Sequence, residues 1–383
     1  MALHFDDQEF KARKDRLLAE MARQHLDAVL MFAQESMYWL TGYDTFGFCF
    51  FQCLVLKSDG TLALMTRSAD LRQARHTSNI EFIHIWVDRR DAGPQQQLRD
   101  LLYDLDLLGA RLGLEYDTQG LTAANGKKLD EALTDFGKIS DVSDLVHRLR
   151  LVKSDAELVY VRKAAELNDE AFQAALDIAG AGVDEGEILA AMHNKIFIGG
   201  GDYAGNEFVI GSAEDALLCR YKSGRRKLSA RDQLTVEFAG TYRHYHVAGM
   251  RTLTIGEPTD RHKELHEAAR EALSECEKVM CPGHTFGDVF EAHAKIFDDR
   301  GLHAHRLNAC GYSLGARFSP SWMDWAMFYQ DNPVEIVPNM VLFAHMILTD
   351  SETNTAMTLG RTYLTHEGAA EPLTRFGLDL YVR

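Results

Sequence analysis

Residues 234–251 read LTVEFAGTYRHYHVAGMR, and the fold of this 383-residue chain can be inferred outward from them. Apolar and polar residues alternate on both sides of a turn at Gly240–Arg243, a pattern that predicts two β-strands. Glu237 stands in the apolar part of the first strand. An ionised carboxylate in such surroundings is costly unless it is paired with a cation or shares a proton. Glu237 therefore needs either a nearby arginine or a chemical role.

The first 150 residues alternate helical and strand patterns. We predict an amphipathic helix at Asp6–Gln24 and further helices near Leu98–Leu107 and Thr122–Phe136. The expected strands are Ala28–Phe32, Phe48–Leu56, Leu62–Met65 and Phe82–Trp86. This order is typical of an α/β domain in which helices cover a sheet.

A capping box predicts the start of a second domain, because Ser154 and Glu157 have the spacing at which each side chain satisfies a free amide at a helix start. We therefore place the domains at residues 1–150 and 151–383. In the second domain, helical periodicity covers Asp155–Ala179, Glu185–Ile196, His262–Lys278 and Phe286–Asp299. The expected strands are Asn206–Ile210, Gln233–Ala239, Tyr245–Ile255, Met340–Leu348, Thr353–Leu359 and Arg361–Thr365. Short connections favour antiparallel pairing, so we expect an α+β domain with helices on one face of a curved antiparallel sheet.

Charge and composition narrow the classes of function. The formal net charge of −16 would repel phosphate backbones and anionic lipid, so we expect neither nucleic acid nor a membrane surface as partner. The first twenty residues lack a signal-peptide pattern and no apolar run reaches the roughly 18 residues of a membrane span, so we expect a cytoplasmic protein. The cluster Gly199–Gly201 follows a helix rather than a strand, which disfavours a phosphate-binding loop.

Histidines occupy two strands that would otherwise be apolar or alternating. His244 and His246 share one face of the returning strand, and His345 alone interrupts the apolar run Val341–Leu348. Each of these imidazoles is either hydrogen-bonded core structure or part of a site. The aromatic, glycine-rich segment Asn308–Trp325 suits a binding wall or a dimer contact.

Six short segments occur in a fixed order along the two halves of the chain. They are Tyr38–Tyr43, Leu149–Ser154, Val236–Gly240 through Arg251-Thr252, Gly311–Gly315, Pro338–Val341 and Leu364–Gly368. Together they resemble the creatinase, prolidase and aminopeptidase P superfamily over essentially the whole chain. The resemblance implies a creatinase-type N-terminal domain, a "pita-bread" C-terminal domain, and a homodimer in which the partner's N-terminal loop reaches the active site.

Peptidases of that superfamily hold two metal ions with Asp, Asp, His, Glu and Glu. By the surrounding motif letters, these positions fall on Glu237, Ala248, Tyr312, His345 and Leu359. Only one carboxylate remains, and alanine and leucine cannot bind a metal, so we expect no metal and no other cofactor. A further substrate-site histidine of the superfamily falls near Arg220, which also departs from the pattern.

Creatinase and ectoine hydrolase are metal-free relatives that cleave amidine carbon–nitrogen bonds, and the resemblance implies a similar hydrolase acting on a small zwitterion. Met250 and Leu359 replace the glutamates that creatinase-like enzymes direct at a guanidinium, which favours an ectoine-type substrate over creatine. We expect Glu237 to act as nucleophile or general base. We expect His345 or His246 to transfer the proton and Tyr312 to donate a hydrogen bond to the intermediate. Arg251 or Arg317 should bind the substrate carboxylate. Further substrate contacts are expected from His244, and from Tyr43 and Phe48 in the partner's aromatic stretch.

Three alternatives stay open at this point. The chain could be a creatinase in the strict sense. It could be an Xaa-Pro peptidase-like or lyase-like enzyme with an altered site, in which Glu237, His244 or His246, and His345 hold a single metal ion. It could also be a homologue that binds a small molecule without catalysis.

Overall fold

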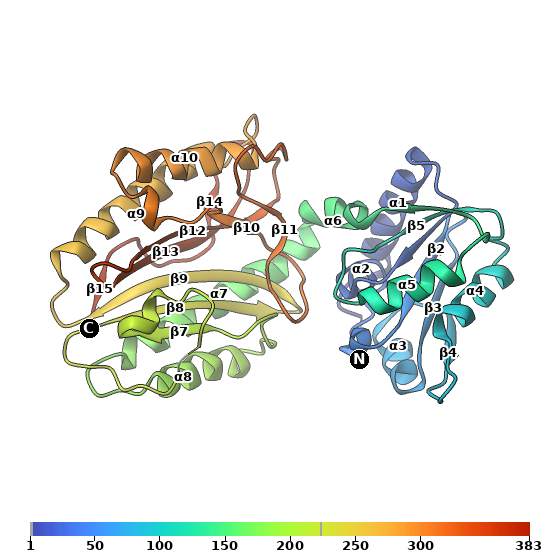
Figure 1. Cartoon of the computed structure of the whole chain (residues 1–383), viewed down its shortest axis with the longest axis horizontal. Helices are drawn as coiled ribbons and strands as arrows, with labels where there is room; N and C mark the ends of the chain where they lie inside the picture. The colour runs from blue at the N-terminus through green and yellow to red at the C-terminus, as the bar shows by residue number, and fades with distance from the viewer. Residues whose placement is uncertain (1–2, 223) are drawn as a thin grey trace. The chain divides into compact units, whose positions relative to one another are not determined.

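The computed structural model describes residues 3–222 and 224–383 of the chain. These residues form two compact units, divided between Arg150 and Leu151 (Figure 1). Among the described residues, no helix is both long and apolar enough to cross a lipid bilayer.

The first unit is an α/β domain built on a six-stranded mixed sheet in the order β4-β3-β2-β1-β5-β6. Its strands are β1 Ala28–Met31, β2 Cys53–Lys57, β3 Leu62–Arg67, β4 Phe82–Trp86, β5 Arg111–Leu114 and β6 Lys138–Asp141. Its helices are α1 Asp7–Arg23, α2 Gln34–Thr41, α3 Leu71–Thr77, α4 Pro94–Asp104, α5 Ala123–Ala132 and α6 Ser143–Leu151. The buried strand β1 contributes alternate residues to two apolar clusters, because neighbouring side chains of a strand point to opposite faces.

The sequence prediction differs from the structure at several elements of this unit, and helices α2, α3 and α6 were not predicted. The predicted strand Phe48–Leu56 is wrong in its first half, because Gly47–Cys49 form a 3₁₀ turn and β2 begins only at Cys53. Strands β5 and β6 were not predicted. Both are short, and β6 is exposed along its whole length, so it has no alternation of apolar and polar residues to reveal it.

The second unit is an α+β domain with a curved antiparallel sheet in the order β11-β10-β12-β13-β9-β8-β7. The strands are β7 Val209–Ser212, β8 Asp232–Tyr242, β9 Tyr245–Ile255, β10 Gly311–Ser313, β11 Asp324–Met327, β12 Val341–Asp350 and β13 Thr355–Leu364, with short β14 Glu371–Pro372 and β15 Tyr381–Val382 at its side. The helices are α7 Asp155–Ile178, α8 Glu185–Ile198, α9 Asp260–Val279 and α10 Phe286–Asp299. Helix α7 packs on β8 and β9, and α9 packs on β12 and β13 (Figure 1).

Local chemistry anchors the first of these helices. Ser154 and Glu157 form the predicted capping box at the start of α7. Glu157 also accepts a hydrogen bond of 2.7 Å from the hydroxyl of Tyr245, so the same carboxylate ties the helix start to β9. The cap thus fixes the entry of α7 against the sheet as well as its first turn.

The strand register brings distant residues into one row. Glu237 on β8 pairs with Met250 on β9, Met250 pairs with Gly360 on β13, and Gly360 pairs with His345 on β12. Paired residues of antiparallel strands share a face of the sheet, so Glu237 and His345 belong to the same face. The predicted strands Thr353–Leu359 and Arg361–Thr365 are in fact one continuous strand, β13.

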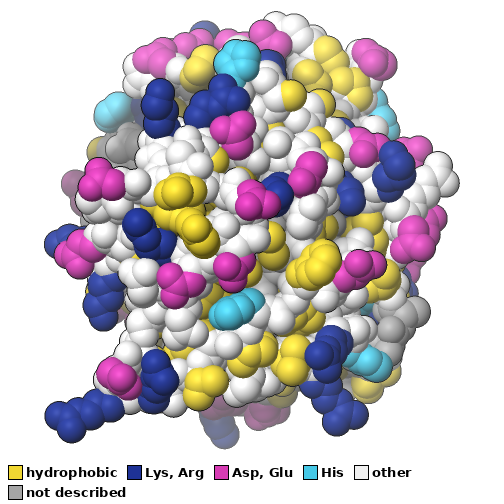
Figure 2. Space-filling view, turned by 90° about the vertical axis from the view of Figure 1, so that its right-hand side faces the viewer, with side chains coloured by type: hydrophobic (Ala, Val, Ile, Leu, Met, Phe, Trp, Pro, Cys, Tyr) yellow, Lys and Arg dark blue, Asp and Glu magenta, His cyan; other side chains and the backbone are white. Residues whose placement is uncertain are grey.

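The side of the molecule shown in Figure 2 carries basic and acidic side chains interspersed with apolar ones. Exposed apolar side chains of the first unit include Phe46, Phe50 and Phe82. On that face acidic and basic side chains are therefore mixed rather than gathered into one patch of either sign.

Candidate active site

A cavity with two chambers lies against the face of the sheet that carries Glu237. The larger chamber has a volume of about 890 Å³, and the smaller about 320 Å³. They share the lining residues Cys219, Arg220, Glu237, Tyr312 and Met323. A small organic substrate could span both chambers, because its surface would be enclosed by side chains from several elements.

Glu237 is the partly buried carboxylate between the two chambers. Burial raises its pKa to about 7, while a hydrogen bond from Tyr312 and the positive charge of Arg220 act in the opposite direction. Within the described chain no lysine or arginine forms an ion pair with it, so it is not held in the salt bridge that was one of the two interpretations of the sequence. A carboxyl group with this pKa can both take up and release a proton near neutral pH.

Tyr312 on β10 lies beside Glu237 on the wall of both chambers. Its hydroxyl donates to Glu237 Oε1 at 3.2 Å and accepts a hydrogen bond of 2.9 Å from the indole Nε1 of Trp322. Burial, together with the charge of Glu237, raises the pKa of Tyr312, so the phenol stays protonated. Tyr312 is therefore a hydrogen-bond donor to the carboxylate rather than a base.

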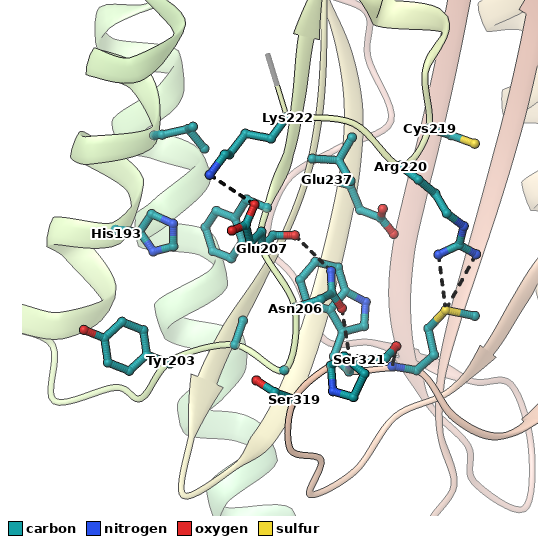
Figure 3. Close-up of a pocket in the computed structure, with 18 of the residues that line it drawn as sticks. His193, Tyr203, Asn206, Glu207, Cys219, Arg220, Lys222, Glu237, Ser319 and Ser321 are labelled. Carbon is teal, nitrogen blue, oxygen red and sulfur yellow. Dashed lines mark hydrogen bonds and ion pairs between the residues drawn. The ribbon is translucent and has the colours of Figure 1, made fainter. Parts of the chain in front are cut away.

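Arg220 enters the cavity from the loop before β8 (Figure 3). The nearest contacts of its guanidinium are to Met323 Sδ, at 3.8 and 3.9 Å. No carboxylate of the described residues pairs with it, and its positive charge acts on Glu237, Tyr312 and His345 alike. An exposed guanidinium that lines a cavity without a carboxylate partner among the described residues suits the carboxylate of a ligand.

His345 lies on the wall of the smaller chamber and is 8% exposed. Burial lowers its pKa to about 4, so the imidazole is neutral at pH 7. Its Nδ1 has no hydrogen-bond partner among the described residues, which leaves a polar atom available to a ligand or a water. Among the described residues that line this chamber, Glu237 is the only carboxylate.

The other two histidines do not fit their expected roles. His246 is fully buried, with Nε2 accepting from the amide of Gly205 at 2.9 Å and Nδ1 at 3.3 Å from the carbonyl of Gly315, so both ring nitrogens are used. Burial lowers its pKa to about 3, and it does not line the cavity. His244 is not in a strand but in the hairpin turn, where it stacks on Phe318 with ring centroids 4.1 Å apart. The structure therefore does not bring His246, expected to transfer protons, or His244, expected to contact substrate, to the wall of this cavity.

The two expected carboxylate-binding arginines also lie elsewhere. Arg251 pairs with Leu359 and thus points to the face opposite Glu237, where it is buried and donates to the carbonyls of Met250, Gly360 and Gly377. Arg317 is engaged with Asp324 at 3.7 Å and is not part of the cavity wall. Arg220, noted in the sequence only as a departure from the family pattern, is the arginine that lines both chambers among the described residues.

Tyr43 and Phe48 were expected to contact substrate from the first domain. Tyr43 is fully buried in that domain's core and Phe48 is nearly so. The exposed aromatic side chains of the same segment are Phe46, at 78%, and Phe50, at 47%. Alternation in the sequence could not reveal this because the segment forms a 3₁₀ turn instead of a strand.

The residues present do not fit a dinuclear metal centre. Of the five positions that the family would use, Glu237, Tyr312 and His345 face the cavity, and Ala248 offers no ligand. Leu359 packs in the apolar cluster on the opposite face, and the residue of β13 that shares a face with Glu237 and His345 is Gly360. No group of three or more His, Cys, Asp or Glu side chains in residues 3–222 and 224–383 is arranged to hold an ion.

Comparisons with known proteins identify the relatives of this chain. Residues 159–367 match the model of metallopeptidase family M24, and residues 13–152 match that of the creatinase/prolidase N-terminal domain. The chain is 23% identical to ectoine hydrolase of Halomonas elongata over 401 residues, covering 100% of this chain and 99% of the relative. It is 20% identical to the Xaa-Pro dipeptidase of Pyrococcus furiosus, covering 87% and 89% of the two chains.

The fold is shared with solved structures of the same group. The prolidase of Thermococcus sibiricus superposes with a TM-score of 0.87 at 18% identity, over 98% of this chain and 99% of that one. The curved antiparallel sheet belongs to the pita-bread domain expected from the sequence, and the expected α/β domain precedes it. With more than half of its length matched by one family model, this chain belongs to metallopeptidase family M24 and carries a creatinase/prolidase N-terminal domain.

Proposed function

We propose that this M24 hydrolase cleaves a carbon–nitrogen bond of amidine type in a small zwitterionic substrate, and that it does so without a catalytic metal. The observation that carries the proposal is the pair formed by Glu237 and Arg220. One is a partly buried carboxylate with a pKa of about 7, and the other is a guanidinium without a carboxylate partner in the described chain. A ligand with a cationic amidinium and an anionic carboxylate complements both charges.

Substrate binding would itself activate Glu237. A positive amidinium beside the carboxyl group favours the ionised form, so it would lower the pKa that burial has raised. Arg220 would hold the substrate carboxylate with two parallel hydrogen bonds, which orients the amidine carbon towards Glu237. The charge of Glu237 is thus fully developed only when substrate is in place.

Ionised Glu237 then acts as a general base. It takes a proton from a water molecule as the water oxygen bonds to the amidine carbon, and a tetrahedral intermediate forms. The proton passes from Glu237 to the departing nitrogen, and the carbon–nitrogen bond breaks to give an amide and an amine. One water is consumed and Glu237 returns to its starting state.

The remaining residues of the smaller chamber would support these steps. Neutral His345 would accept a hydrogen bond from a substrate N–H, because its low pKa makes it a poor proton donor at pH 7. Tyr312 keeps Glu237 oriented through the bond to Oε1. A covalent acyl-imidate adduct between Glu237 and the amidine carbon, detected by intact-protein mass spectrometry, would assign the carboxylate as nucleophile instead of base.

The test is a mass-spectrometric screen of ectoine, hydroxyectoine, creatine and Xaa-Pro dipeptides, run with and without chelator. We expect turnover of a cyclic amidine, unaffected by chelator, and loss of that turnover in Glu237→Gln. Chelator-sensitive cleavage of an Xaa-Pro dipeptide would overturn the proposal in favour of a peptidase. Binding without any product, seen as a thermal shift alone, would point to a non-catalytic homologue.

We also propose that the protein is a homodimer and that the first domain contributes a loop to the partner's cavity. Phe46 and Phe50 support this, because exposed aromatic side chains in one short segment suit an apolar contact. Light scattering of the wild type and of a Phe46→Ser, Phe50→Ser double variant tests it. A monomeric wild type would contradict it.

A further inference from the structure

A chain of two hydrogen bonds runs from Trp322 to Glu237. The indole Nε1 of Trp322 donates to the Tyr312 hydroxyl at 2.9 Å, and that hydroxyl donates to Glu237 Oε1 at 3.2 Å. Trp322 and Tyr312 are 1% and 3% exposed, so water competes little for either bond. All three residues line the larger chamber.

The chemistry of the indole fixes the direction of both bonds. An indole N–H can only donate, so the phenol oxygen of Tyr312 must accept at that contact. The single proton of the hydroxyl is then left for Glu237 Oε1. Because Oε1 accepts this proton, the proton that Glu237 itself gains or loses belongs on Oε2.

The loop that carries Trp322 is held on two sides. The backbone amide of Trp322 donates to Asn206 Oδ1 at 3.0 Å. Next to it, a Cβ at position 205 would lie 2.7 to 2.8 Å from the backbone of Ser321 and Trp322, so only glycine allows the observed approach. The amide of Gly205 is in turn bound by His246 at 2.9 Å. His246, which we expected to transfer protons, thus helps to place the segment that supports Trp322.

We infer that Trp322 is a positioning residue: its indole N–H sets the direction of the Tyr312 hydroxyl and so reserves Oε2 of Glu237 for proton exchange with the substrate. The inference rests on the proposed role of Glu237. An accepted hydrogen bond makes a hydroxyl a stronger donor, so Trp322 also strengthens the bond from Tyr312 to Glu237.

The test is Trp322→Phe, which removes the N–H and keeps an aromatic ring. Trp86→Phe is the matched control, because Trp86 also donates a 2.9 Å hydrogen bond, to the carbonyl of Phe51 in the first domain. The readout is the infrared band of the protonated Glu237 carboxyl, followed against pH and identified by its loss in Glu237→Gln. This measures the protonation of Glu237 whether or not a given substrate is turned over.

We expect Trp322→Phe to raise the titration midpoint of Glu237 by a few tenths of a pH unit, and Trp86→Phe to leave it unchanged. In a Tyr312→Phe background, Trp322→Phe should have no further effect, because the bond that it acts through is already gone. A midpoint equal to the wild type, or the same change with and without Tyr312, would overturn the inference.

Misfolding of the variant and failure of the proposed function can each be distinguished from failure of the inference about Trp322. If Trp322→Phe does not fold, Asn206→Ala releases the backbone of the same residue, and we expect a smaller change in the same direction. No change in that folded variant would also count against the inference. A shifted midpoint in a protein that hydrolyses none of the screened substrates would leave the positioning role intact and refute the proposed function.

Discussion

Replacing Tyr312 with phenylalanine removes one hydroxyl and leaves the ring in place. In the wild type this hydroxyl donates to Glu237 Oε1 at 3.2 Å, a distance beyond the roughly 2.5–3.0 Å usual for O–H···O bonds. We therefore take the lower end of the range for a hydrogen bond to a charged group, about 1.5 kcal/mol. One pKa unit corresponds to about 1.36 kcal/mol, so the loss should raise the pKa of Glu237 by about one.

The direction of the pKa change follows from the form of Glu237 that the hydrogen bond stabilises. Tyr312 stabilises the ionised carboxylate and so lowers a pKa that burial has raised to about 7. Without the hydroxyl the ionised fraction of free enzyme at pH 7 falls from about one half to about one tenth. If ionised Glu237 is the base, kcat/KM at pH 7 falls about fivefold, while the loss above pH 9 is small.

The assay is the pH profile of kcat/KM on the best substrate from the screen, in the presence of chelator. Tyr116→Phe is the control, because Tyr116 also donates to a carboxylate, that of Asp130 at 2.6 Å, but in the first domain. The acidic limb should move up by about one pH unit in Tyr312→Phe and stay in place in Tyr116→Phe. A limb that stays in place in both variants, or moves down in Tyr312→Phe, would refute the assignment of that limb to Glu237.

Four further outcomes are expected. Glu237→Gln should abolish turnover, and its stability relative to the wild type should rise by about 3 kcal/mol between pH 4 and pH 8, because the unfolded wild type releases the Glu237 proton near pH 4.5 while the folded protein holds it up to about pH 7. A stability difference between the two proteins that is the same at pH 4 and at pH 8 would contradict this. Arg220→Met should raise KM at least tenfold for substrates with a carboxylate without changing thermal stability, and an unchanged KM would remove it from the substrate site. Arg251→Met should lower the free energy of unfolding by about 2–4 kcal/mol and leave KM unchanged, because it removes the donor to the carbonyls of Gly360 and Gly377. A raised KM would instead support the role in substrate-carboxylate binding that the sequence suggested for Arg251. Dialysis against chelator should leave both turnover and melting temperature unchanged, and elemental analysis showing a stoichiometric metal would contradict the metal-free mechanism.

Much of the fold could be predicted because its signals are local. The capping box of Ser154 and Glu157 depends on a spacing of three residues, and the long helices of the second domain repeat their apolar residues at helical period. The elements that were missed or misplaced, such as β6 and the start of β2, are short or exposed. Such segments bury too little apolar surface to leave a pattern in the sequence.

The residues of the candidate site also fall into those that the sequence could reveal and those that it could not. Glu237 and His345 could be singled out from sequence because each is a polar residue within an apolar strand, and Tyr312 followed from the family resemblance. Arg220 and Trp322 carry no such signal. They lie in loops whose path is set by contacts far away in the sequence, such as that between Asn206 and the amide of Trp322.

By itself, then, the sequence determined the family, the two kinds of domain and one acidic residue, Glu237, that lines the cavity. Only the tertiary structure decided which basic residue faces that acid. The reason is the hairpin turn: Arg243 and His244 both have positive φ and form a tight two-residue connection between β8 and β9. That turn pairs Glu237 with Met250, so Arg251, one residue further along, points to the opposite face. The sequence of one strand shows which of its own residues share a face. The register with the neighbouring strand is needed to show which residues of both strands lie on the same face of the sheet.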